Sequence, residues 1–229
     1  MTDRSSRAAC VRSVARHMLR RPDVRTVLTP NQPPARRTQQ ERREQTERKV
    51  VAAATALIAE HGSRALTLSA VGEAAGYSRG IVSHHFGSRE NLLRAVMRDA
   101  QAFNLPDPGE SAGVWLADTV RAYLKNVTNK RPAARAFLQM WGEAIATDPV
   151  LMPLYAEQDA RFRRLLADKV REGIRDGSVR ADADPEAMAV SLLGLLRGIA
   201  LQLISTPPPA RVKAIIDEAE RATRRALRP

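Results

Sequence analysis

Apolar side chains recur every three or four positions along most of the chain after residue 38, and no segment alternates with a period of two. This spacing gathers apolar residues on one face of an α-helix, so the sequence predicts an all-α protein. In residues 39–61, for example, the stripe consists of Val50, Val51, Ala54, Leu57 and Ile58, and Gly62 follows as a stop signal.

Prolines and glycines divide this helical pattern into segments. Asp148-Pro149 and Asp184-Pro185 each place a carboxylate before a proline, which is typical of a helix start. A fourth helix is expected at 88–102 and a ninth at 210–227, and a turn-rich segment at 106–109 is expected to separate two domains.

Residues 67–93 read TLSAVGEAAGYSRGIVSHHFGSRENLL, which predicts two short helices that cross closely, a helix-turn-helix. Gly72 is small enough for a close crossing, and Gly76 suits a left-handed turn. Thr67 and Ser78 stand where helix N-caps are expected. The predicted small core consists of Val71, Ala74, Val82 and Phe86.

This segment resembles the DNA-binding region of the TetR family of transcriptional regulators, in which three N-terminal helices bind DNA and six further helices form a dimerising, ligand-binding body. The resemblance covers residues 39–95 closely and implies about nine helices. It implies a homodimer that binds a pseudopalindromic operator in double-stranded DNA and is released by a small-molecule effector. Repression is the commoner outcome in the family, and activation stays open.

The expected domains are a basic disordered arm at 1–38, a DNA-binding domain at 39–87, a connecting helix at 88–105 and a body at 106–229.

The resemblance also assigns DNA-contacting positions. The helix from Ser78 to His85 would enter the major groove, and Arg79 would read guanine through two hydrogen bonds or contact a phosphate. Ser78, at a helix start, also suits a phosphate. The full set nearest the bases is Arg79, Gly80, Ile81 and Ser83, and the expected backbone anchors are Thr67, His84 and Arg89.

One position departs from the family pattern. The family usually has tyrosine where this chain has Ser83, and that phenol commonly reaches a phosphate. We therefore expect one phosphate contact to be lost or weakened at Ser83, and His84 or His85 could replace it. A sensor that no longer binds DNA is therefore a competing hypothesis.

Seven of the nine aromatic residues lie in or beside the C-terminal body, which suits a cavity with aromatic and aliphatic walls. The same stripes are also typical of ordinary helical core, and both interpretations stand at this point. The predicted ligand pocket consists of Trp115, Thr119, Tyr123, Phe137, Met140, Trp141, Tyr155 and Phe162.

The last two helices have apolar faces too broad for one buried side. The family resemblance implies that they pair with their copies in a four-helix dimer interface. The predicted interface consists of Leu193, Leu196, Ile199, Leu203, Val212, Ile215 and Ile216.

The formal charge of +12 is concentrated at the N-terminus, where residues 1–38 hold nine Arg and two Asp, a net +7. A basic arm attracts nucleic acid without reading its sequence, so a nonspecific nucleic-acid-binding protein is a second alternative. The arm is equally compatible with a solvated tail or with a start codon placed too far upstream.

Other classes of protein find little support in the sequence. No metal-ligand spacing, phosphate loop or G-x-S-x-G motif is present, so we expect neither an enzyme nor a metal or cofactor. The longest apolar run, 187–204, is interrupted by Ser191, Arg197 and Gln202, so no membrane-spanning segment is expected. A single cysteine, Cys10, indicates a reducing compartment, and we expect a cytoplasmic protein.

Overall fold

The computed structural model of the chain describes residues 38–107, 111–204 and 210–229. The chain divides into two units, residues 1–38 and residues 39–229. The predicted arm, with Cys10, lies outside the described residues except for Thr38.

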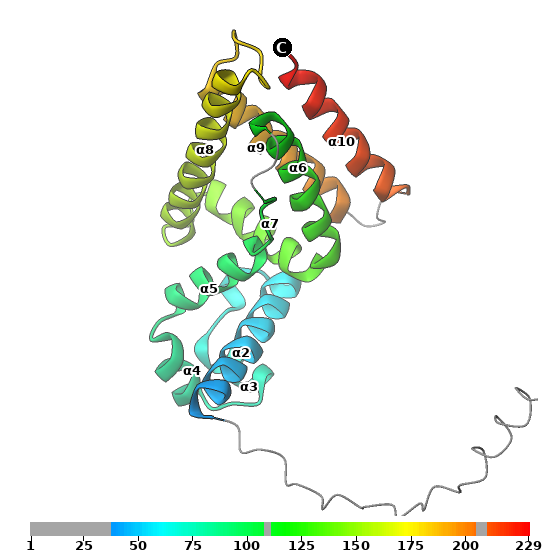
Figure 1. Cartoon of the computed structure of the whole chain (residues 1–229). Helices are drawn as coiled ribbons and strands as arrows, with labels where there is room; N and C mark the ends of the chain where they lie inside the picture. The colour runs from blue at the N-terminus through cyan, green and yellow to red at the C-terminus, as the bar shows by residue number, and fades with distance from the viewer. Residues whose placement is uncertain (1–37, 108–110, 205–209) are drawn as a thin grey trace, which may run out of the picture. The chain divides into compact units, whose positions relative to one another are not determined.

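The described residues of the second unit contain nine α-helices, one 3₁₀ helix and no strand, so the all-α prediction is confirmed (Figure 1). The first group of helices is α2 (Gln39–His61), η1 (Ser63–Ala65), α3 (Leu68–Ala75), α4 (Arg79–Phe86) and α5 (Arg89–Gln101). The second group is α6 (Ala112–Asn129), α7 (Arg131–Ile145), α8 (Leu151–Asp176), α9 (Pro185–Ile204) and α10 (Val212–Leu227).

The predicted caps of the helix-turn-helix are confirmed. The Thr67 hydroxyl oxygen accepts a hydrogen bond from the Ala70 backbone N–H at 3.1 Å, and the Ser78 hydroxyl oxygen accepts one from the Ile81 N–H at 3.3 Å. Gly76 ends α3 with φ of 74°, a left-handed conformation that glycine adopts without a Cβ clash. These three residues fix where α3 stops and where α4 starts.

The close crossing of α3 and α4 depends on Gly72, because a Cβ there would lie 2.8 Å from the Tyr77 carbonyl oxygen. Val71 and Val82 are fully buried, as predicted. The prediction for Ala74 is wrong: it is exposed, and Ala75, one position later on the helix, packs against the core instead.

In the body, the predicted start of α9 is confirmed. The Asp184 carboxylate accepts a hydrogen bond from the Ala187 N–H at 2.8 Å, and the helix begins at Pro185. The Asp148 carboxylate likewise accepts from the Leu151 N–H at 2.9 Å, but α8 begins only at Leu151, two residues after Pro149.

A buried ion pair joins α8 to α9 inside the body. The Arg197 guanidinium, whose residue is 8% exposed, donates two hydrogen bonds to the Asp159 carboxylate. It also lies 5.0 Å from the ring centroid of Trp141 on α7. Because burying either charge alone is costly, the pair holds these helices in register.

A second polar cluster joins α7 to the first group of helices. The Glu143 carboxylate accepts hydrogen bonds from the backbone N–H of Ser63, at 3.0 Å, and from its hydroxyl. The Arg89 guanidinium donates to the Ser63 carbonyl at 2.6 Å and to the Leu66 carbonyl at 2.9 Å. Since Ser63 is fully buried, these contacts tie η1, which precedes α3, to both α5 and α7.

Candidate nucleic-acid interface and effector site

The first turn of α4 carries exposed side chains that suit base recognition. Arg79 and Gly80 are exposed, and Ile81 is 41% exposed, which is unusual for a large apolar residue. A guanidinium can bond to guanine, and an apolar side chain can contact the methyl group of thymine. Arg79 has no partner within the described part of the chain, so its donors are available to an external acceptor.

The hydroxyls of Thr67 and Ser78 flank this turn and are also exposed. Each uses its oxygen as an acceptor within the cap, which leaves the O–H free to donate. An O–H donor beside a helix N-terminus is well placed for a phosphate oxygen.

The end of α4 holds a pair of histidines. His84 is exposed and His85 is half-buried, and their rings meet edge to face with centroids 5.8 Å apart. Ser83, before them, is half-buried. The structure thus gathers Arg79, Gly80, Ile81 and His84 on one helix, with Ser83 less accessible than they are.

Arg89 is placed differently from its expected role as a phosphate anchor. Its guanidinium is used inside the protein, on the carbonyls of Ser63 and Leu66. Arg89 therefore holds η1 through its Nε and Nη2 donors, and its role as a phosphate anchor stays a prediction.

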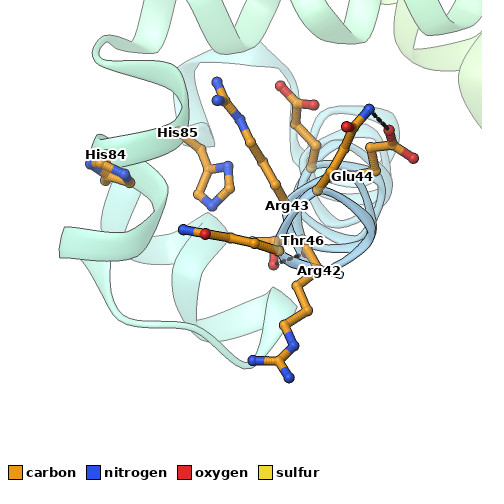
Figure 2. A pocket seen from close by; sticks show the side chains of 9 residues that line it. Arg42, Arg43, Glu44, Thr46, His84 and His85 are labelled. Atoms are coloured by element: carbon orange, nitrogen blue, oxygen red, sulfur yellow. Dashed lines mark hydrogen bonds between the residues drawn. The ribbon is translucent and has the colours of Figure 1, made fainter. Parts of the chain in front are cut away.

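Sequence reasoning missed Arg42 and Arg43 at the start of α2. Both are exposed, and neither guanidinium group has a partner among the described residues. In the sequence they stand in a run of mixed charges, and only the fold places them beside the end of α4, where they line one hollow with His84 and His85 (Figure 2).

The body has an open groove between the end of α5 and α8, with a volume of about 420 Å³. Its walls include Phe103, Leu105 and Phe162, and the guanidinium-bearing Arg98 and Arg161 also line it. We refer to it as the α5–α8 groove. Of the predicted pocket residues, Phe162 lines it.

Beside this groove lies a second hollow of only about 10 Å³, which is lined by Tyr123 and Phe137 among others. Gln101 lines both spaces, and the rings of Phe103 and Tyr123 are perpendicular with centroids 5.6 Å apart. A hollow of this size has room for about one water molecule and not for an effector.

The remaining predicted pocket residues line neither hollow. Tyr155 donates a hydrogen bond from its hydroxyl to the Phe137 carbonyl at 2.6 Å, and burial raises the pKa of Tyr155 well above its ordinary value. Trp115 donates to the Pro106 carbonyl at 2.9 Å. Thr119 and Met140 are fully buried, and Trp141 packs against the core. These residues pack in the helical core in this conformation, and their role as pocket lining stays a prediction.

The exposed stripe of α9 is apolar. Val190 is 57% exposed and Leu201 is 53% exposed, and a Cβ added at Gly194 or Gly198 would meet no atom within 4 Å. In contrast, Leu193, Leu196, Leu203 and Ile216 of the predicted interface are buried within the chain, which leaves little of their surface for a partner. Ile199, Val212 and Ile215 are half-buried.

Helix α9 does not overturn the membrane prediction, because a helix packed in a protein core can be equally long and apolar. By length and composition alone this helix could cross a membrane, because its polar interruptions are few, and 39% of its apolar window is buried in the protein.

Comparison with known proteins agrees with this geometry. Residues 50–96 match the family described as bacterial regulatory proteins, tetR family, and residues 112–228 match the BetI-type transcriptional repressor C-terminal family. The HTH-type transcriptional repressor AcnR of Corynebacterium glutamicum is 24% identical over 177 residues, which are 77% of this chain and 92% of that protein. The HTH-type transcriptional regulator BetI 2 of Chromohalobacter salexigens is 29% identical over 169 residues, which are 69% of this chain and 77% of that protein.

A solved structure supports the same fold. A putative TetR-family transcriptional regulator from Rhodococcus sp. superposes with a TM-score of 0.68 at 21% identity, covering 80% of this chain and 99% of that one. The family and these relatives are transcriptional regulators, not enzymes. The chain belongs to the TetR family and is a transcriptional regulator.

Proposed function

We propose that the chain is a repressor that binds a pseudopalindromic operator as a dimer and is released by a small-molecule effector. The observation that carries the DNA part is the exposed first turn of α4, where Arg79 has free donors and Ile81 is exposed. Arg79 reads guanine, Ile81 contacts a thymine methyl group, and the hydroxyls of Thr67 and Ser78 donate to phosphates.

Gly80 and His84 complete the DNA-contacting surface of α4. Gly80 carries no side chain, so the helix backbone approaches the groove closely, and exposed His84 contacts the DNA backbone near Ser83. The missing tyrosine at Ser83 removes one phosphate contact, which the exposed histidine replaces.

The dimer forms through the exposed stripe of α9 rather than through the buried residues that the sequence pattern suggested. Val190 and Leu201 supply apolar area, and Gly194 and Gly198 allow a second helix to approach. The half-buried Ile199, Val212 and Ile215 lie at the margin of this contact. Two copies then present two α4 helices about 34 Å apart, one helical turn of DNA.

The effector binds the α5–α8 groove, whose lining combines aromatic and aliphatic side chains with the cationic Arg98 and Arg161. This lining fits a compound with an apolar body and an anionic group. Because α5 follows α4 directly in the chain, a ligand that favours another position of α5 also changes the placement of α4.

The DNA part is tested by selecting preferred duplexes from a random-sequence pool with the full chain and repeating the selection with Arg79→Ala. We expect a two-fold-related preferred sequence for the wild type. At one position in each half-site, the substitution reduces the difference in binding free energy between the preferred base and the others by roughly 1–3 kcal/mol, which is what one bidentate contact contributes. An unchanged preferred sequence would show that Arg79 reads no base.

The effector part is tested by release of the bound duplex with octanoate and with octyltrimethylammonium, which share an apolar chain but differ in charge. We expect release by octanoate and a weaker response from Arg161→Ala. Equal release by both compounds, or release by the cation alone, would contradict an anionic effector.

A further inference from the structure

The interior of the body holds a buried cation whose hydrogen bonds are only partly satisfied. Arg197 of α9 is 8% exposed, and its guanidinium donates two hydrogen bonds to the Asp159 carboxylate of α8. Its third nitrogen, Nε, is also buried and has no hydrogen-bond partner among the described residues. A buried donor without an acceptor costs free energy, so Arg197 retains the capacity to bind a further anionic oxygen.

Helix α6 adds polar groups to the same interior. The Thr119 hydroxyl oxygen is buried and has no hydrogen-bond partner within the described part of the chain. Tyr123 lies one helical turn later, so the two side chains share one face of α6. Burial raises the pKa of Tyr123, and the nearby charge of Arg197 opposes that shift. The phenol therefore keeps its proton at neutral pH, and neutral hydroxyls stand on the helix that faces the cation.

Aromatic side chains connect this interior to the α5–α8 groove. Phe103 lines the groove, and its ring meets the ring of Tyr123, which lines the small hollow beside the groove. Phe137 lines that hollow too, and its ring centroid lies 5.8 Å from the guanidinium carbon of Arg197. An apolar chain that displaces the Phe103 ring from Tyr123 therefore leads from the groove toward Arg197.

Asp159 lies between the ion pair and the groove. It is next to Gln158 on α8 and nearly one turn before Phe162, and both of these residues line the groove. The side chain of Asp159 retains 15% exposure. If its carboxylate leaves Arg197, it can turn toward the groove, where water and the cationic Arg161 stabilise the charge.

We propose that Arg197 is the anion-recognising residue of the effector site and that the effector's carboxylate replaces Asp159 on its guanidinium. This inference rests on the proposed function, since it extends the α5–α8 groove inward and names the ligand class as carboxylates with an apolar chain. The buried guanidinium stays compensated, because one carboxylate leaves as another arrives. Since the ion pair joins α8 to α9, the exchange frees α8 to move, and the effector favours the conformer in which it has moved.

Calorimetric titration of the full chain with octanoate, in the absence of DNA, tests this exchange. Arg197→Met keeps a long side chain in the core but removes the donors, so we expect the Kd for octanoate to rise roughly 10- to 100-fold, as for the loss of hydrogen bonds to a charged group. Asp159→Asn removes the competing charge and keeps the shape of the side chain, so octanoate should bind it more tightly than it binds the wild type. Unchanged or weaker binding by Asp159→Asn would overturn the exchange.

Arg121→Met is the matched control, because Arg121 also pairs with two carboxylates in the body, those of Asp217 and Glu220, but lines neither hollow. Its affinity for octanoate should equal that of the wild type, and melting curves confirm that each variant is folded. If the wild type binds octanoate and Arg197→Met binds it as tightly as Arg121→Met does, the anion stays in the outer groove, so the exchange is wrong and the proposed function stands. If neither the wild type nor Asp159→Asn binds octanoate, both the exchange and the proposed anionic effector fail.

Discussion

At the residue scale, the regulator depends on a few side chains whose environments could not be predicted from their neighbours in sequence. Thr67, Ser78 and Gly76 were predictable, because caps and left-handed turns are local chemistry. Arg89 was not, because its partners, the carbonyls of Ser63 and Leu66, lie more than 20 positions earlier. Arg42 and Arg43 were missed for the same reason.

The contact between Glu143 and buried Ser63 allows a direct test of what holds η1 in place. Glu143→Ala leaves the Ser63 N–H and hydroxyl without an acceptor in a buried site, so we expect the free energy of unfolding to fall by about 2 kcal/mol. Urea denaturation measures this change. Glu157→Ala is the control, because its surface ion pair with Arg94 should contribute less than about 1 kcal/mol. Equal losses in the two variants would show that Glu143 does not hold η1.

At the element scale, helix boundaries were predictable and helix faces were not. Pro185 and the carboxylate of Asp184 before it mark the start of α9 independently of the rest of the fold, because the capping hydrogen bond is local. The apolar pattern of α9, however, runs around most of the helix, and periodicity alone does not say which side meets the chain's own core. This is why Leu196 and Leu203 were expected at the dimer interface and are buried, while Val190 and Leu201 are exposed.

The ion pair between α8 and α9 gives the first prediction at this scale. Asp159→Ala leaves the buried Arg197 charge uncompensated, so we expect a loss of about 3 kcal/mol in unfolding free energy. Adding Arg197→Met should recover much of that loss, because a buried apolar side chain carries no unpaired charge. Asp168→Ala, in an exposed pair with Arg171, serves as control and should change stability little. A double variant no more stable than Asp159→Ala would contradict this account.

The contact of α8 with the start of α6 gives a pH-dependent prediction. The Ala112 N–H donates to the Asp176 carboxylate at 2.9 Å, and this hydrogen bond lowers the pKa of Asp176. A carboxylate with a lowered pKa in the folded state stabilises the protein above its unfolded pKa of about 4, and that stabilisation is lost as pH falls through the folded value. The melting temperature of Asp176→Asn should therefore be below that of the wild type at neutral pH.

The same comparison at acid pH supplies the control. The difference between wild type and Asp176→Asn should shrink as the carboxyl group becomes protonated. A difference that stays constant from neutral to acid pH would mean that the charge of Asp176 contributes nothing.

At the scale of the whole molecule, binding to a two-fold-related site requires two copies, which we propose are joined through α9. The exposed apolar stripe of this helix is explained if a second copy covers it. Leu201→Glu places a charge in the proposed contact and should give a monomer, as measured by light scattering during size-exclusion chromatography. Ile145→Glu is the matched control, because Ile145 is 63% exposed on α7 and lies outside this stripe. If Leu201→Glu is still a dimer, the interface lies on another surface of the chain.

Residue patterns could predict the family and the DNA-binding end because the helix-turn-helix is a local structure with caps, glycines and a small core in fixed order. The proposed effector site could not be predicted in this way. Three of the six aromatic residues expected to line a pocket, Trp115, Trp141 and Tyr155, pack in the core, and the α5–α8 groove depends on the placement of Phe103 and Leu105, beyond the end of α5.

The central claim is that two α4 helices, held by one dimer, occupy successive turns of a single DNA site. Footprinting of the DNA upstream of the protein's own gene tests this most directly. We expect two protected half-sites related by two-fold symmetry, with centres about 10 base pairs or a multiple of that apart, and we expect Leu201→Glu to weaken both. Uniform weak protection along the whole fragment, or one unpaired half-site that Leu201→Glu leaves unchanged, would contradict the account.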